Sequence, residues 1–378
     1  MAEELLPSPH PLTPLRSEDE WLDWLRLLRS RRVGPTTFFR LMAEHGSAAA
    51  ALQALPEVAR AAGVEKYETC PIGVAVNEIK AGRLAGAALV AYGSDQYPKD
   101  LAQLPDAPPF LWVLGDAGLL QSPMIALVGA RNASSLGTRM ARKLGGELTE
   151  AGFVVVSGLA RGVDTAAHLA ALEGGTIAVM AGGVDVIYPS ENAVLGQEIG
   201  EKGLRLSEQP VNLQPQARHF PTRNRIISGL SQAVVVVEAA AKSGSLITAR
   251  NALDQGREVL AVPGHPFDAR AAGCNMLIRD GAILIRHAAD VVELVKAREA
   301  QPELPLAQDP TPEKPPRSLQ DIGQLHSRIL SRLGPSPVAE DQLIRDLGAP
   351  ARAVSPELVA LELEGKITRQ PGGLLALA

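Results

Sequence analysis

The 378-residue sequence contains few cysteines and few aromatic residues, and each scarcity narrows the class of protein. Its two cysteines, Cys70 and Cys274, stand far apart, without the spacing of a disulfide framework or a zinc site, which fits a reducing cytoplasm. The seven histidines are scattered and form no HExxH pattern. We therefore expect no metal site. With aromatic residues at only 3%, we expect small side chains to pack helices closely against a sheet.

Long hydrophobic runs and the common nucleotide-binding loops are also missing. No apolar run approaches the roughly 20 residues that span a membrane. The N-terminus carries acids and prolines instead of the basic and apolar regions of a secretory signal. Neither GxGxxG nor GxxxxGK[ST] occurs, which argues against a dinucleotide cofactor and against P-loop ATP hydrolysis. We expect a cytoplasmic protein without a cofactor and without membrane contact.

The net charge of −5 argues against a protein that coats nucleic acid with its whole surface. Any nucleic-acid site must therefore be a local basic patch. One basic segment extends from residue 209 to residue 237 and contains Arg218, Arg223 and Arg225 but no acid. A second lies within residues 131–143. If the fold brings these segments together, they offer a surface for a polyanion.

Proline content and hydrophobic periodicity divide the chain into five parts. Residues 1–17 are rich in proline and are predicted to be disordered. Residues 18–83 combine helical apolar stripes with a Gly-Pro turn, like a SAM or helix-hairpin-helix domain, which either contacts DNA backbone or only packs on its neighbour. Residues 84–298 form the central domain, residues 299–320 a Pro-rich linker, and residues 321–378 a winged-helix-like domain of three helices and a hairpin.

Apolar strands alternate with amphipathic helices in the central domain, which predicts an α/β fold: an extended Rossmann-like core with a mostly parallel sheet. A run made only of Ala and Val, such as Ala233–Val237, indicates a strand that is buried on both faces. Ligands of such sheets lie outside the carboxyl ends of the strands. The expected strands are Ala88–Tyr92, Phe110–Leu114, Ile125–Val128, Phe153–Val156, Thr176–Met180, Ala233–Val237, Val259–Val262 and Ile283–Ile285.

The segment that begins at Phe220 places an aromatic ring beside Arg223, Asn224 and Arg225, just before a buried strand. An aromatic face beside arginines suits a single nucleic-acid strand, because the cations attract phosphates and the ring accepts a base. The alternative is that an arginine caps a helix or pairs with an acid. For the whole cluster, with Arg218 just before it, we favour nucleic-acid binding.

Three strand-to-helix turns are rich in glycine or serine. Their backbone amides, hydroxyl groups and basic side chains make sites for anions. Three such turns at one sheet favour a polyanion, either a nucleic-acid strand or a nucleotide, over capping alone. The candidate binding residues are Gly129, Arg131 and Ser134 in the first turn, Gly158, Arg161 and Gly162 in the second, and Lys242, Ser243, Gly244, Ser245 and Thr248 in the third.

Asp164 and His168 lie four residues apart on one face of the helix that follows the second turn. They are either an acid–base pair or structural residues that brace the turn. We favour the structural role, because no nucleophile accompanies them. No catalytic residue is predicted.

The C-terminal domain is a poor candidate for reading DNA. Its presumed recognition helix carries Glu357, Glu362 and Glu364, which repel phosphate. We expect this domain to contact protein or to pack without a ligand.

Taken together, these loops resemble the DNA-processing protein A (DprA, also called Smf) family from about Tyr92 to Val295. One departure is Ala130, where the family frequently has Ser. The matching motifs are Val128–Arg131, Ser157–Asp164 with His168, Ile187–Pro189 with Asn192, Ser207-Glu208, Phe220–Leu230, Val236–Ala239, Ser243–Ser245 with Thr248-Ala249, Val262–Gly264, Gly273, Asn275, Leu277-Ile278 and Asp280–Ala282.

The resemblance implies a function. It implies a homodimer that binds single-stranded DNA without sequence preference, and duplex DNA only weakly. Such a protein protects incoming strands and loads the RecA recombinase during natural transformation and DNA recombination, with no catalysis. Phe220 would approach a base, and the residues that would hold phosphates are Arg131, Arg223, Asn224, Ser243, Gly244 and Ser245.

An enzyme is the alternative. Phosphoribohydrolases of the lysine-decarboxylase-like type share the Rossmann fold and bind phosphate after a similar strand. They carry a PGGxGT turn with a nearby catalytic glutamate, whereas this chain has no acid between Glu238 and Asp254. We therefore do not favour the enzyme. A protein that only docks partners is a third possibility, and strand-binding measurements separate it from the first.

Overall fold

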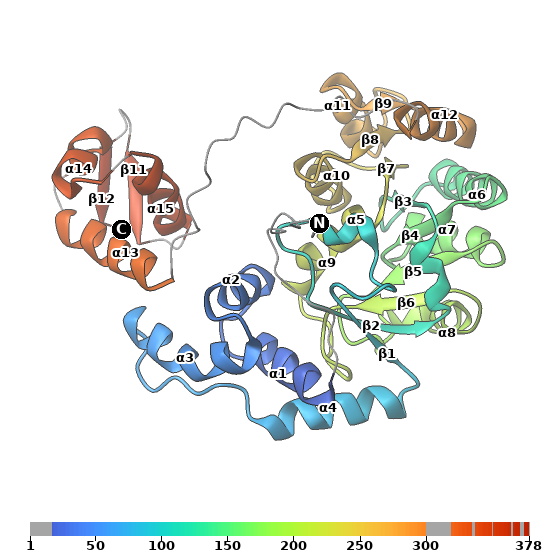
Figure 1. The fold of residues 1–378 in the computed structure, drawn as a ribbon. Helices are drawn as coiled ribbons and strands as arrows, with labels where there is room; N and C mark the ends of the chain where they lie inside the picture. Colours follow the sequence, from blue (N-terminus) through green and yellow to red (C-terminus); the bar gives the residue numbers. More distant parts are fainter. Residues whose placement is uncertain are drawn as a thin grey trace, which may run out of the picture.

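The computed structural model describes residues 17–299, 319–334, 337–349, 351–363, 366–370 and 374–377. Its elements form an N-terminal group of helices, a central sheet covered by helices, and a small C-terminal domain (Figure 1). The predicted disordered segment, apart from Ser17, and the Pro-rich linker, apart from its ends, lie outside the described residues.

The N-terminal domain consists of α1 (Glu18–Arg29), α2 (Pro35–His45), α3 (Ala48–Ala61) and α4 (Ile72–Leu84). A capping box starts α1, because Ser17 and Glu20 each satisfy the backbone amide of the other. The predicted Gly-Pro turn lies directly at the start of α2. Trp21 of α1 stacks on Phe110 of the central domain, with 5.3 Å between the ring centroids, so the two domains share a core.

Within residues 17–299 the central sheet has nine strands in the order β1-β2-β6-β5-β4-β3-β7-β8-β9. From β6 to β9 neighbouring strands are parallel, while β1 and β2 are antiparallel at one edge. The bounds are β1 (Ala88–Ala91), β2 (Phe110–Gly115), β3 (Met124–Val128), β4 (Val154–Ser157), β5 (Thr176–Val179), β6 (Leu204–Ser207), β7 (Ala233–Val236), β8 (Glu258–Ala261) and β9 (Ile283–Leu284).

The expected strands are confirmed to within about one residue at each end, but β6 was not expected. Its short apolar run is interrupted by Arg205, which hides the strand pattern from a periodicity argument. Arg205 is nevertheless 8% exposed between β2 and β5. Burial lowers the pKa of its guanidinium.

Helices cover both faces of the sheet, since alternate residues of each strand point to opposite sides (Figure 1). Ile125 and Leu127 of β3 pack toward one set of helices, while Ala126 and Val128 pack toward the other. The first set is α6 (Ser135–Glu150), α7 (Val163–Ala171), α8 (Ala193–Lys202) and α12 (Ala288–Glu299), and the second is α5 (Lys99–Ala102), α9 (His219–Leu230), α10 (Ser245–Asp254) and α11 (Ala272–Arg279). Two short 3-10 turns, η1 (Ala117–Gln121) and η2 (Ser190–Asn192), complete the domain.

The C-terminal domain has the predicted winged-helix elements and its own apolar core. Glu357 lies 2.7 Å from His326, Glu362 is also on the last helix, and Glu364 lies outside the described residues. The elements are α13 (Leu319–Arg332), β10 (Val338–Ala339), α14 (Glu340–Leu347), α15 (Ala351–Leu363), β11 (Ile367–Gln370) and β12 (Leu374–Leu377).

A buried carboxylate joins the N-terminal helices to the sheet, which makes Glu78→Ala informative. Glu78 is 8% exposed, accepts two hydrogen bonds from Arg29 (2.8 and 2.9 Å) and accepts one from Nε1 of Trp112 (2.9 Å). Its removal leaves these donors buried without their acceptor, so we expect the free energy of unfolding to fall by about 3–5 kcal/mol. Urea denaturation measures this change. As a control, Glu18→Ala removes a pair to Arg83 whose acid is 90% exposed and should cost less than about 1 kcal/mol; equal losses would contradict the argument.

Candidate nucleic-acid interface

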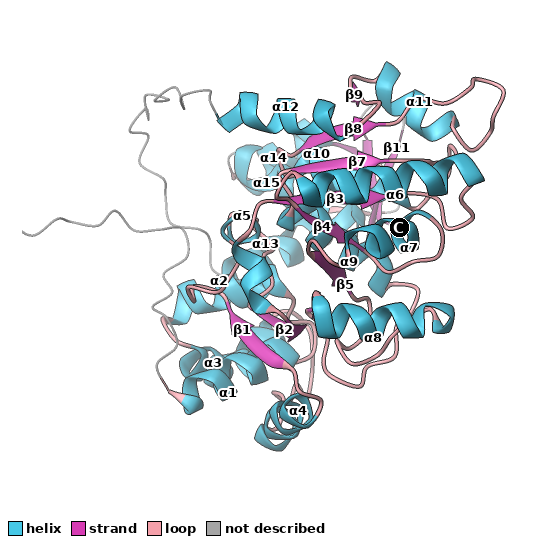
Figure 2. Cartoon of the chain, turned by 90° about the vertical axis from the view of Figure 1, so that its right-hand side faces the viewer, coloured by secondary structure: helices cyan, strands magenta, loops and turns pink. Residues whose placement is uncertain are grey.

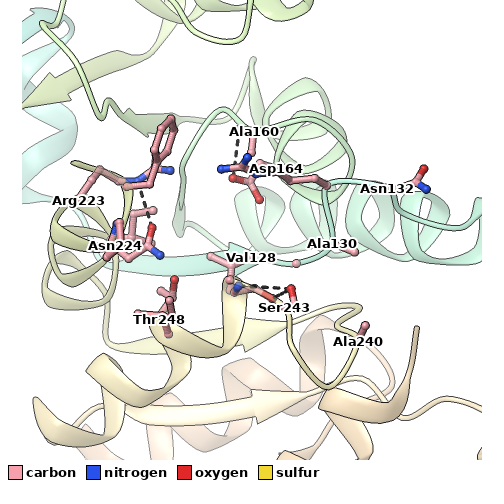
Figure 3. A pocket seen from close by; sticks show the side chains of 18 of the residues that line it. Val128, Ala130, Asn132, Ala160, Asp164, Arg223, Asn224, Ala240, Ser243 and Thr248 are labelled. Carbon is pink, nitrogen blue, oxygen red and sulfur yellow. Dashed lines mark hydrogen bonds between the residues drawn. The ribbon is translucent and has the colours of Figure 1, made fainter. Parts of the chain in front are cut away.

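A pocket of about 980 Å³ opens at the carboxyl ends of β3, β4 and β7 (Figure 3). In Figure 3, Arg223 and Asn224 project toward it from α9, with Ser243 and Thr248 on the α10 side. We call this pocket the groove. The predicted site residues that line it are Gly129, Arg131, Phe220, Arg223, Asn224, Lys242, Ser243, Gly244, Ser245 and Thr248.

Two aromatic rings and an arginine form one wall of the groove. The guanidinium of Arg131 lies 5.2 Å from the centroid of the Phe220 ring, a cation–π distance. The Tyr188 ring lies 5.7 Å from the same ring at an interplanar angle of 58°. Tyr188 is 49% exposed and follows β5 in the chain. A flat ligand therefore meets a ring that is already open to solvent.

Arg223 is buried beneath the groove and fastens its elements together. Its side chain is 6% exposed, and Nη1 donates to the carbonyls of Gly158 (2.7 Å) and Val179, which end β4 and β5. Its Nε donates to Oδ1 of Asn224 (3.2 Å). Burial lowers the pKa of the guanidinium to about 10, while nearby Asp164 opposes that shift. Arg223 therefore stays charged at neutral pH and ties α9 to the sheet edge.

Asp164 and His168 brace the second turn, which confirms the structural role. Oδ2 of Asp164 accepts from the amides of Gly158 (3.1 Å) and Ala160 (3.3 Å). His168 is fully buried and accepts from the amide of Leu159 (3.3 Å). Burial, reinforced by Arg223, lowers the pKa of His168 to about 3. A buried, neutral imidazole bonded to the backbone is not poised for acid–base chemistry.

The start of α6 is occupied by the chain's own carboxylate. Oε1 of Glu238 accepts from the Ser134 amide (2.8 Å), and Oε2 accepts from the Ser134 hydroxyl group. The Ser134 oxygen in turn accepts from the Gly137 amide (2.9 Å). A Cβ on Gly137 would lie 2.5 Å from the Glu238 carboxylate and would displace it. Sequence reasoning missed Glu238, although an acid directly after an apolar strand was visible.

The start of α10 is open by comparison. Gly244 at the capping position has no side chain to cap the helix and nothing within 4 Å of a would-be Cβ, and the Ser245 amide donates to Oγ of Ser243 (3.4 Å). The hydroxyl groups of Ser243 and Ser245 are 2.8 Å apart, and Lys242 is exposed beside them. A helix N-terminus with free space, hydroxyl groups and a lysine suits an anion.

The remaining candidates lie outside the groove lining. Arg161 is exposed and pairs with Glu191 at 3.4 Å, and Arg218 is exposed just before α9. Arg225 pairs with Glu208 at 2.5 Å and with Asp106 at 3.4 Å, the structural alternative left open by the sequence. Groove residues that the candidate set missed include Asn132, Tyr188 and Arg270. Tyr188 belongs to one of the motifs that match the family, whereas Arg270 lies in no motif that would have indicated a binding role.

Two classes of site are not found in the described part of the chain. Nowhere among those residues do three His, Cys, Asp or Glu side chains gather so that they could hold a metal ion. None of the helices in the same residues has the length and apolar character needed to cross a membrane.

Comparisons with known proteins agree with this architecture of a helical domain, a Rossmann-like core and a winged helix. The family model "DNA recombination-mediator protein A" matches residues 88–296, "DprA-like N-terminal HHH domain" matches residues 18–81, and "DprA winged helix domain" matches residues 310–373. The chain therefore belongs to the DprA/Smf family of DNA recombination-mediator proteins. The resemblance and the predicted fold class are both confirmed.

Individual relatives support the same family. Protein Smf of Escherichia coli is 39% identical over 293 residues, which cover 76% of this chain and 77% of the relative. DprA of Streptococcus pneumoniae has a solved structure with a TM-score of 0.60 and 36% identity, covering 72% of this chain and 97% of that chain. A structure described as showing the single-stranded DNA binding mode of Helicobacter pylori DprA has a TM-score of 0.52 and 31% identity, covering 56% and 96%.

The turn after β4 allows no side chain at Gly162. Its φ is +81°, and a Cβ would lie 2.3 Å from the carbonyl oxygen of Ala130 in the neighbouring turn. We expect Gly162→Ala to lower the free energy of unfolding by about 2 kcal/mol or more, from left-handed strain plus overpacking. Urea denaturation measures the loss. Gly244→Ala is the matched control, because its φ of −62° and its open surroundings accept a methyl group; similar losses in both variants would contradict this role of Gly162.

Proposed function

We propose that this protein binds single-stranded DNA in the groove and acts as a recombination mediator. In this role it protects incoming strands and loads the RecA recombinase during natural transformation and DNA recombination, in the cytoplasm. The observation that carries the proposal is that exposed cations, a helix start with glycine at its capping position and two aromatic rings all line one groove. RecA loading and transformation rest on family membership.

A single strand fits this groove better than a duplex. Each unpaired base has a free face that can stack on Tyr188 or Phe220, whereas duplex bases are stacked on one another. Stacking accepts every base, so binding without sequence preference follows. A duplex offers only its phosphates to the cations and is bound weakly.

Phosphates are held by two kinds of group. Arg131 and Lys242 are exposed and reach the groove from separate turns, while the α10 start offers the positive end of its helix dipole and the hydroxyl groups of Ser243 and Ser245. Arg223 and Asn224 line the groove from α9, where the buried charge of Arg223 adds a positive field. A strand that crosses the groove therefore meets cations at several successive points.

A non-catalytic role is favoured over the phosphoribohydrolase-like alternative. That chemistry requires a carboxylate that faces the ligand. The carboxylate of Asp164 at the groove accepts two backbone amides, and that of Glu238 binds Ser134. Both acids thus serve the scaffold.

We also propose that the protein is a homodimer. Strand β9 is an edge of the sheet, and its residues Ile283 and Leu284 are 37% and 46% exposed. Met276 on the neighbouring α11 is 36% exposed. An apolar sheet edge invites pairing with a second copy.

The first test compares DNA forms. We expect oligothymidylate to bind more tightly than a duplex of equal length, because only the single strand presents base faces. Fluorescence anisotropy titrations at several salt concentrations measure both affinities, and the log–log salt slope for the single strand should be about −0.7 per phosphate contacted. Equal affinity for both forms at moderate salt would contradict the proposal.

The second test removes a groove cation. Arg131→Ala deletes an exposed guanidinium that reaches the groove and lies over Phe220, so we expect about tenfold weaker binding of oligothymidylate, or about 1.4 kcal/mol. Arg250→Ala is the control, since Arg250 is also exposed but lies further along α10, outside the groove lining. Circular dichroism checks the folding of both variants. If both lose affinity equally, the groove has no special role.

A further inference from the structure

The loop between β8 and α11 carries an aromatic ring that is exposed to solvent. Figure 2 shows both of these elements at one edge of the central domain. Phe267 in this loop is 95% exposed, the largest exposed fraction among the large apolar side chains of the described residues. The His265 ring lies beside it, with centroids 5.5 Å apart and an interplanar angle of 37°. Leaving a phenyl ring in water forgoes the stabilisation that burial gives, so the position suits contact with a ligand.

Hydrogen bonds hold this loop in a defined shape. At its base, Gly264 and Asn275 exchange two hydrogen bonds of 3.1 and 3.0 Å. Near its tip, the Asp268 carboxylate accepts from the Arg270 amide (3.0 Å), and the Phe267 amide donates to Nδ1 of His265 (3.3 Å). The ring is therefore presented by a structured loop that needs no rearrangement to receive a partner.

The same loop reaches the groove. Arg270, three residues after Phe267, lines the groove from the β8 side. Tyr188 lines it from the opposite side, after β5. In the sheet, β5 and β8 are separated by β4, β3 and β7. At about 4.8 Å between neighbouring strands, the carboxyl ends of β5 and β8 lie about 19 Å apart. A single DNA strand that starts at Tyr188 and runs along the carboxyl edge of the sheet therefore reaches the loop between β8 and α11.

The chemistry of the loop favours a nucleic-acid base over an apolar protein surface. Phe267 is flanked by His265, Pro266, Asp268 and Arg270, so it is a single ring among polar groups and not part of a broad apolar patch. The loop therefore supplies a ring face for a base at Phe267 and, three residues later, a groove-lining cation at Arg270, whose guanidinium lies 3.3 Å from Asp268.

We propose that His265 and Phe267 form a second stacking platform, which binds a base of the same single strand that occupies the groove. This inference rests on the proposed function and extends it. The groove holds one part of the strand near Tyr188 and Phe220, Arg270 contacts the connecting phosphates, and the platform holds a base further along. The site then requires a minimum strand length for full affinity.

The experiment measures affinity against strand length. Wild type and Phe267→Ala are titrated by fluorescence anisotropy with oligothymidylates from about 4 to 16 nucleotides, the range of site sizes for single-strand folds. We expect equal affinities on the shortest oligomers and about tenfold weaker binding by the variant on the longest, equivalent to about 1.4 kcal/mol. Phe267→Tyr should retain the affinity. Phe267→Leu, which keeps the apolar bulk without the π face, should behave like Phe267→Ala.

Leu84→Ala is the matched control, because Leu84 is 90% exposed and lies at the end of α4, so its affinities should equal those of wild type at every length. Light scattering reports the oligomeric state of each variant. The platform is overturned if Phe267→Ala binds every length as wild type does, if Phe267→Leu matches wild type, or if Phe267→Ala changes the mass of the particle, which would assign the ring to a protein contact. A wild type that binds no oligomer instead refutes the proposed function itself.

Discussion

The groove depends on one buried guanidinium, that of Arg223. It donates to carbonyls at the ends of β4 and β5 and thereby fixes the start of α9 against the sheet edge. Phe220 lies three residues earlier on the same helix and is positioned by that attachment. A Cβ on Gly158 would lie 2.3 Å from Nη1 of Arg223, so any side chain at this position would displace the guanidinium. Asp164 nearby opposes the cost of burying the charge, which lets a cation exist inside the domain.

The N-termini of α6 and α10 both suit an anion, but in the described structure only that of α6 is occupied by a carboxylate of the chain. Glu238 binds at the N-terminus of α6 and fixes the turn that carries Arg131. The positive end of this helix dipole is therefore already paired with a carboxylate of the chain itself. The N-terminus of α10 has glycine at its capping position and no carboxylate of the described residues bound to it, and it lies beside Lys242. An internal carboxylate thus positions one cation, while the start of the neighbouring helix α10 holds no carboxylate from the described part of the chain and has hydroxyl groups and a lysine beside it. The turns look alike in sequence but differ in function.

Local and near-neighbour features could be predicted from the sequence. Apolar runs predicted the strands other than β6, and most of the candidate binding residues taken from the loops line the groove. What could not be predicted depends on contacts that are distant along the chain. The carbonyls that Arg223 binds lie 65 and 44 residues away, and Arg225 lies 17 residues from Glu208. One arginine is therefore buried under the groove and its near neighbour is ion-paired outside it, although both stand in the same basic segment.

The difference between buried or ion-paired arginines and exposed cations explains how an acidic protein can present a cationic groove. Asp164 compensates part of the cost of burying the Arg223 charge, and Arg225 pairs with Glu208 and Asp106, so these side chains stabilise the scaffold. The positive field available to a DNA strand comes mainly from Arg131 and Lys242, which extend from two separate turns into one groove, while Arg270 lines the groove but pairs with Asp268 at 3.3 Å. Because field lines concentrate in a cleft, a few such side chains suffice despite the net charge of −5. Their exposure lets them exchange water for phosphate without disturbing the buried network that places them.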